Sequence, residues 1–113
     1  MPAGQLTLVC ERRANFSTVL TWRNEALALV NLTGYTAELR VRAGQNDMGE
    51  LLATFNVGNS RVTLGGAAAT VTIMMTAADT ALLTPRPAWY VLELTSGAGT
   101  VTRLSEGPFV IKP

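Results

Sequence analysis

Hydrophobic and polar residues alternate over much of this chain, with the period of two that is typical of half-buried β-strands. The clearest example is residues 35–42. There the odd positions from Tyr35 to Val41 are apolar, and the even positions from Thr36 to Arg42 are polar. This segment is predicted to form a strand with one face on a core and the other toward solvent.

Other segments have extended patterns that favour strands, and turn-forming residues separate most of them. The segment Gly97-Ala98-Gly99 is predicted to be the turn of a C-terminal hairpin. The pair Gly107-Pro108 is predicted to kink the last strand or to end its pairing on one edge, because proline cannot donate a ladder hydrogen bond. The predicted strands are residues 5–11, 15–24, 50–57, 61–64, 67–75, 88–96 and 100–112.

One short helix is predicted near residues 77–83. Thr76 and Asp79 have the spacing of a capping box, with Asp in place of the preferred Glu. Pro85 then ends the helix. A second local feature is the turn Leu32-Thr33-Gly34 before Tyr35, where a glycine permits the backbone reversal that a side chain would hinder. We predict that Leu32, Gly34 and Tyr35 form a structural turn.

The strand spacing predicts the fold class. Seven or eight short strands, one short helix and no alternation of strands with helices indicate an all-β domain, and an antiparallel sandwich of two sheets is the natural architecture. A small closed barrel is the alternative, because sequence patterns do not show whether sheet edges meet. The length of 113 residues fits one domain, residues 1–113.

The composition restricts the partners that we expect. The chain is 48% hydrophobic and 15% charged, with a net charge of +1, which is less charge than a free monomer usually carries. Some surface is therefore expected to contact a partner. No cluster of basic residues supports nucleic-acid binding. No apolar run is long enough to span a membrane, and the N-terminal residues do not have the pattern of a signal peptide.

The sequence offers little for catalysis. It has no histidine, and its acidic residues are scattered singly, so we predict no enzymatic activity, no cofactor and no metal. The loop with Asn46, Asp47 and Glu50 provides too few carboxylates for calcium, and a polar turn is favoured. Cys10 lies on the apolar side of a predicted strand and is expected to be an inert core residue.

Two late strands are apolar on both faces, and Met74, Trp89 and Val91 need cover on the outer side. The helix near 77–83 or a partner chain would provide it. We therefore predict a partner interface at Trp89, Val91 and Met74, with Asp47 and Met48 of the 44–50 loop as a second candidate. Trp22, Trp89 and Tyr90 also suggest a sugar-stacking platform, but core packing is favoured for them.

Several motifs occur in a characteristic order. They are LTGYTAELRVR (32–42), VTLGGAAATVTIMM (62–75), TAADTALL (76–83), WYVLEL (89–94) and RLSEGPFVI (103–111). In this combination the chain resembles the small immunoglobulin-like proteins of tailed bacteriophages. It is similar to the N-terminal domain of phage upper baseplate proteins and to short tail or head accessory proteins. The resemblance covers residues 5–111.

This resemblance implies an immunoglobulin-like β-sandwich that acts as a non-enzymatic virion structural protein. Its expected partners are other virion proteins in a symmetric assembly, including copies of itself, and its expected location is the virion after synthesis in the host cytoplasm. The sequence ends at Lys112-Pro113 without a fibre or receptor-binding domain. We therefore expect an adaptor, accessory or cementing subunit of the tail, baseplate, neck or capsid. A carbohydrate-binding module for host attachment is the alternative.

Overall fold

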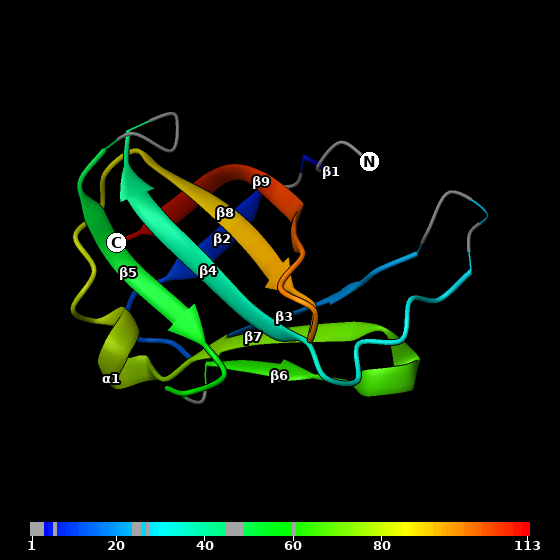
Figure 1. Cartoon of the computed structure of the whole chain (residues 1–113). Helices are drawn as coiled ribbons and strands as arrows, with labels where there is room; N and C mark the ends of the chain where they lie inside the picture. The colour runs from blue at the N-terminus through cyan, green and yellow to red at the C-terminus, as the bar shows by residue number, and fades with distance from the viewer. Residues whose placement is uncertain (1–3, 6, 24–25, 27, 45–48, 60) are drawn as a thin grey trace.

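The computed structural model describes residues 4–5, 7–23, 26, 28–44, 49–59 and 61–113, and it consists of two packed β-sheets (Figure 1). The larger sheet has the order β1-β9-β8-β4-β5, and β2 also pairs with β9. The smaller sheet has the order β3-β7-β6. In the larger sheet the strands are β1 (Gly4–Gln5), β2 (Leu8–Glu11), β4 (Thr36–Ala43), β5 (Leu51–Asn56), β8 (Ala88–Thr95) and β9 (Val101–Lys112); in the smaller they are β3 (Phe16–Thr21), β6 (Val62–Leu64) and β7 (Thr70–Met75).

The strand order is immunoglobulin-like. In the order of each sheet, β9, β8, β4 and β5 correspond to the G, F, C and C′ strands, and β3, β7 and β6 correspond to B, E and D. These neighbours pair antiparallel, whereas β1 and β2 pair parallel with β9. Among the described residues no ladder joins the two sheets, so the predicted sandwich is confirmed and the barrel alternative is wrong.

The predicted face separation of residues 35–42 is confirmed, since Ala37, Leu39 and Val41 are buried between the sheets. The turn before this strand also forms as predicted. The N–H of Tyr35 donates to the carbonyl oxygen of Leu32 over 3.0 Å, and Gly34 has a φ of +84°. A positive φ at the third position is the requirement of a type II turn, which favours glycine there.

Aromatic rings fill the centre of the core. Phe109 of β9 lies against Phe16 of β3 and Phe55 of β5, with ring-centroid distances of 5.8 and 6.5 Å. Phe16 and Phe55 are also 6.5 Å apart, at an interplanar angle of 69°. This cluster therefore joins strands of both sheets, and its edge-on geometry is the one that aromatic pairs prefer.

The predicted helix is shorter than residues 77–83. Helix α1 covers Ala77–Thr80, and the hydroxyl of Thr76 accepts from the N–H of Asp79, which is half of a capping box. The N–H groups of Leu82 and Leu83 bond three residues back, so the chain tightens into a turn that carries Leu83 into the core. No helix in the described ranges has the length and hydropathy of a membrane span.

The predicted strand 67–75 also begins later than expected. Residues 66–68 form a 3₁₀ helix, η1 (Gly66–Ala68), and Ala69 has a φ of +59°. The chain cannot continue as a ladder through that left-handed residue, so β7 begins at Thr70.

The prediction for Gly107-Pro108 is confirmed in its second form. Strand β9 pairs with β1 at Ser105 and Glu106 and with β2 from Phe109 onward. Thr7, which lies opposite Pro108 in this register, is outside any ladder, so pairing on this edge is interrupted at Pro108, whereas pairing with β8 continues through Gly107 and Pro108. The interruption agrees with the missing N–H of proline.

Two ionisable groups in the core hold their protons tightly. The hydroxyl of Tyr90 lies 2.8 Å from Oγ of Ser105. Burial raises the pKa of Tyr90, the hydrogen bond to Ser105 lowers it in part, and Glu106 raises it further. Burial and then the charge of Glu11 raise the pKa of the Cys10 thiol. The prediction that Cys10 lies in the core is confirmed.

These pKa shifts predict that alkaline pH destabilises the fold. The ordinary pKa values of Cys10 and Tyr90 are 9.0 and 10.0, and below them folded and unfolded chains both keep the protons. As pH rises past these values the unfolded chain ionises first, so the free energy of unfolding falls until the folded groups also ionise. Urea unfolding from about pH 7 to about pH 11 measures this decline.

The variants Tyr90→Phe and Cys10→Ala separate the two contributions. In Tyr90→Phe the free energy of unfolding should fall less steeply above the ordinary tyrosine pKa of 10.0. In Cys10→Ala the part of the fall that begins near the ordinary thiol pKa of 9.0 should be absent. Alkaline curves parallel to the wild-type curve for both variants would contradict the assignment.

Candidate functional site

The two outer faces of the sandwich differ in charge. None of the residues of β3, β6 and β7 is charged, whereas the outward positions of β4, β8 and β9 carry arginine and glutamate. The outward residues of the smaller sheet form a surface that we call the neutral face. It consists of Ser17, Val19, Thr21, Thr63, Thr70, Thr72 and Met74.

The centre of the neutral face is Thr72 on β7, paired with Val19 on one side and Thr63 on the other. Val19 is 56% exposed and Met74 is 42% exposed. Threonine and valine have stiff side chains, so this surface loses little side-chain entropy when another molecule covers it. The face is therefore suited to contact with a protein surface.

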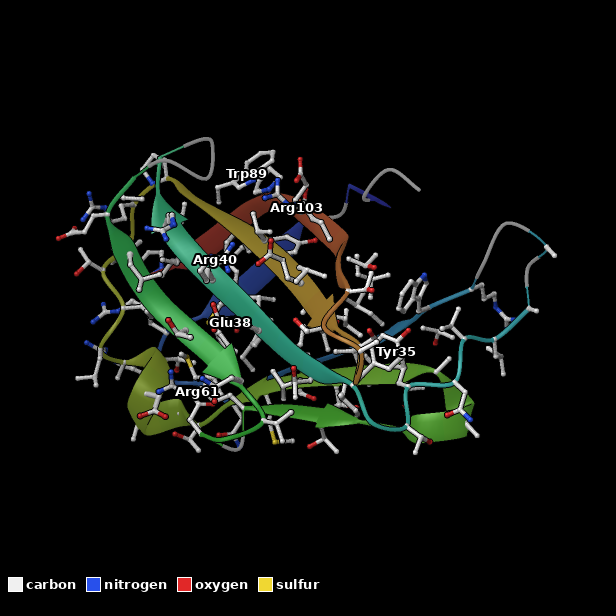
Figure 2. The ribbon with its side chains drawn as sticks, in the orientation of Figure 1. Tyr35, Glu38, Arg40, Arg61, Trp89 and Arg103 are labelled. Carbon is white, nitrogen blue, oxygen red and sulfur yellow. The ribbon has the colours of Figure 1, made fainter. Side chains whose placement is uncertain are left out.

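The opposite face carries a network of ion pairs. The guanidinium of Arg40 donates to Glu93 over 2.8 Å and to Glu38 over 3.1 Å. Arg103 pairs with Glu106 over 3.1 Å and lies 3.8 Å from Glu93. Figure 2 shows Glu38, Arg40, Trp89 and Arg103 over this sheet. Arg40 thus joins β4 to β8 on the outward side of the larger sheet.

The structure corrects the prediction that Val91 needs cover from the helix or from a partner. Val91 is 0% exposed, and its partners across the two ladders are Arg40 and Glu106. Long charged side chains can cover apolar neighbours with their stems while the charged ends reach water. Val91 therefore has no exposed surface for another chain. Helix α1, the other cover that was predicted, lies at an end of the sandwich (Figure 1).

A pocket of about 440 Å³ lies at the end of the neutral face nearest α1. Met74 and Ser17 line it from the sheet, and Arg61 and Asp79 line it from the loops. The other lining residues are Asn15, Phe16, Asn59, Met75 and Thr76.

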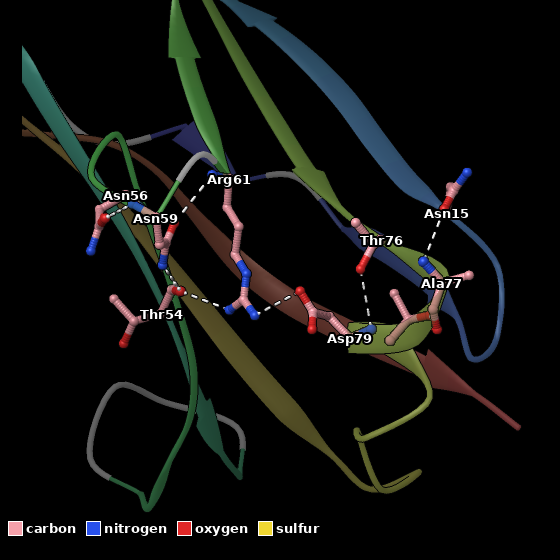
Figure 3. Close-up of polar contacts among 9 residues, drawn as sticks. Asn15, Thr54, Asn56, Asn59, Arg61, Thr76, Ala77 and Asp79 are labelled. Atoms are coloured by element: carbon pink, nitrogen blue, oxygen red, sulfur yellow. Dashed lines mark hydrogen bonds and ion pairs between the residues drawn. The ribbon is translucent and has the colours of Figure 1, made fainter.

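Arg61 fixes the polar side of this pocket (Figure 3). Its guanidinium donates to the carbonyl oxygen of Thr54 over 3.1 Å and to Asp79 over 3.0 Å, and it lies 5.6 Å above the ring of Phe55. Asn59 donates to the same carbonyl of Thr54 over 3.0 Å. Arg61 and Asp79 thus form an ion pair, and this pair holds α1 against the turn between β5 and β6.

Trp89 lies in a separate hollow of about 590 Å³ on the charged side of the molecule. Arg86, Pro87, Pro108 and Val110 are among its lining residues. Trp89 and Met74 are on opposite outer faces of the sandwich, so they do not form the single interface that was predicted. Asp47 and Met48 lie outside the described residues.

The aromatic platform is not formed. Tyr90 points into the core, and Trp22 is buried with its ring edge-on to Tyr35 at 6.0 Å. Only Trp89 of the three faces outward. These rings share no surface on which a sugar could stack.

The sequence pattern predicted an outward position for Met74 but did not indicate the rest of the neutral face. The signal was present in three segments without charge, FSTVLT, VTL and TVTIMM. Their significance depends on the topology, because only the pairing of β3 and β6 with β7 assembles them on one sheet.

No protein-family model and no curated protein matches this chain. Among solved structures, it is similar to Drosophila OTK, extracellular domains 3–5, with 17% identity and a TM-score of 0.38 over 97% of this chain and 33% of that chain. The chain thus spans about a third of that structure. It is also similar to a VGSC beta subunit from a photo-crosslinking study of multimeric cell-adhesive interactions. That match has 9% identity and a TM-score of 0.42, over 96% of this chain and 90% of that chain. Neither neighbour informs the function of this chain.

Proposed function

We propose that this chain is a non-enzymatic structural protein of a tailed-bacteriophage particle, which docks on another virion protein through its neutral face. It acts as an adaptor, accessory or cementing subunit. Its partner presents a flat, uncharged surface, because a charged partner would lose hydration there without gaining an ion pair.

The observation that carries this proposal is the contrast between the two outer faces. A face that stays in water normally carries mixed charges, as the Arg40 and Arg103 networks do on the larger sheet. The smaller sheet has no charge on its strands and leaves Val19 and Met74 exposed. The absence of charge on this face, together with exposed Val19 and Met74, is what we expect of a contact with another protein.

Two further features support the assignment. The resemblance of the LTGY and WYVLEL segments to small phage proteins agrees with the immunoglobulin-like strand order. The polar groups beside the pocket are also engaged with one another, Arg61 with Asp79 and Asn59 with Thr54, which suits a rigid docking surface.

The test is the composition of purified particles. Mass spectrometry with copy counting should find the chain in virions at a fixed number set by the symmetry of a ring or shell. The variant Thr72→Glu, at the centre of the neutral face, should reduce incorporation at least about tenfold, because it buries an unpaired charge at the contact.

Thr36→Glu is the matched control. Thr36 is exposed on β4, at an outward position of the other sheet, and this variant should enter particles like the wild type. Thermal unfolding of both purified variants separates loss of docking from loss of folding. Absence of the chain from particles would refute the virion role, and equal incorporation of the two variants would refute the neutral face as the contact.

A further inference from the structure

Strand β3 has an open edge. It pairs with β7 on one side, and in the described part of the chain no strand pairs with its other side. In an immunoglobulin fold the first strand pairs with the second in this sheet. Here the described N-terminal strands β1 and β2 pair with β9 instead. None of the described residues therefore occupies the position that a first strand would take beside β3.

The ladder shows which backbone groups face this position. The N–H of Trp22 donates to the carbonyl oxygen of Ala69 on the β7 side. The backbone N–H and C=O groups of the even-numbered residues of β3 therefore face β7. The backbone groups of Ser17, Val19 and Thr21 consequently point outward. None of these three residues has a hydrogen bond to another described residue on that side.

The edge is accessible along its first half. A groove of about 520 Å³ separates it from β2, and Leu8, Val9 and Glu11 line the β2 side. Ser17 and Thr18 line the β3 side. This groove leaves room for another strand to approach the outward backbone groups.

We propose that β3 pairs with β3 of a second copy of this chain, antiparallel and about a two-fold axis through Val19. Val19 then lies opposite Val19 and Ser17 opposite Thr21, so all three outward residues form hydrogen-bonded pairs in one register. The two smaller sheets become one six-stranded sheet, and their neutral faces become continuous. This inference rests on the proposed assembly role, for which it names one partner.

The charge distribution selects a second copy as the occupant. The strand itself is uncharged, so it offers no ion pair that would select a charged strand of another protein. Against a second copy, each side chain meets a neutral one: valine meets valine and a hydroxyl meets a hydroxyl. A register shifted by two residues in either direction retains fewer of the outward pairs within Phe16–Thr21.

An uncharged open edge also needs a device against unspecific pairing. Natural edge strands are protected by charged residues, proline or a bulge, and β3 has none of these between Phe16 and Thr21. Pairing with an identical strand provides that protection by closing the edge of both copies.

The test uses the purified chain. Sedimentation over a range of concentrations should show reversible dimers. Val19→Lys should raise the dissociation constant at least about tenfold, because two lysines then face each other across the axis. Thr63→Lys, on the far strand of the same face, should leave the dissociation constant unchanged. The unfolding of each variant confirms that it folds.

Cysteine variants locate the contact. Val19→Cys should form a disulfide-linked dimer on mild oxidation, since Cα atoms in such a pair lie about 5.5 Å apart. Thr63→Cys should not, because five strand spacings of about 4.8 Å separate the two sites in the proposed dimer. Cys10 is buried and leaves the introduced thiol as the reactive one.

Each outcome decides between the proposals. A wild-type chain that stays monomeric, or equal cross-linking of the two cysteine variants, would overturn the β3 pairing and leave the virion role standing. The purified chain could also form dimers with the expected variant effects and yet be absent from particles. That result would support the β3 pairing and refute the virion role.

Discussion

Replacing Phe109 with alanine is expected to lower the free energy of unfolding by about 3–5 kcal/mol. Phe109 is 1% exposed, and its ring lies against Phe16 and Phe55 from two other strands. Truncation removes the burial of one ring and leaves a cavity between the sheets, which their backbones cannot close without breaking ladders. A loss of this size is a large part of the 5–15 kcal/mol that holds a typical domain folded.

Urea unfolding of the purified chain measures this loss. Val110→Ala is the matched control, because Val110 is the next residue on β9 and is 38% exposed. It should cost less than about 1 kcal/mol. Similar losses for the two variants would mean that β9 does not have the inward and outward alternation described here.

Replacing Arg40 with alanine is expected to cost about 2–3 kcal/mol, more than a surface arginine normally contributes. The Arg40 side chain is 20% exposed and bonds Glu93 and Glu38, so its removal leaves the half-buried carboxylate of Glu93 with the longer contact to Arg103. It also uncovers Val91, its partner on β8. Both effects act in the same direction.

Arg86→Ala is the control for this second prediction. Arg86 pairs with Glu50 over 3.5 Å, and the two side chains are largely exposed, so the change should cost about 0.5 kcal/mol or less. A double-mutant cycle of Arg40→Ala with Glu93→Gln isolates the pair. A coupling free energy near zero would show that the loss comes from uncovering Val91 and not from the ion pair.

Most of the fold follows from local patterns. The alternation from Tyr35 to Val41 predicts a strand with one buried face, and the glycine at position 34 predicts its turn, because each depends on neighbouring residues alone. The limits of α1 do not follow in this way. Asp79 has the spacing of a capping residue, but its carboxylate pairs with Arg61 from another loop. Leu83 is buried in the core, so the helix ends before it.

The candidate site is less predictable because it depends on which strands are neighbours. Met74 is apolar at an outward position, and the sequence suffices to identify it. Val91 has the same pattern, yet it is buried, because the register places Arg40 and Glu106 beside it. Whether an outward apolar residue is exposed is thus decided by side chains that are more than ten positions away in the sequence.

The position of β9 between β8 and the N-terminal strands has a consequence for synthesis. This last strand pairs with β8 and also with β1 and β2 from the beginning of the chain. Among the strands of this domain β9 is synthesised last, so β1 and β2 lack their partner until β9 has emerged from the ribosome. Pairing of β1 and β2 is therefore a late step in the folding of this domain, and chaperones have their longest access to these two strands during this interval.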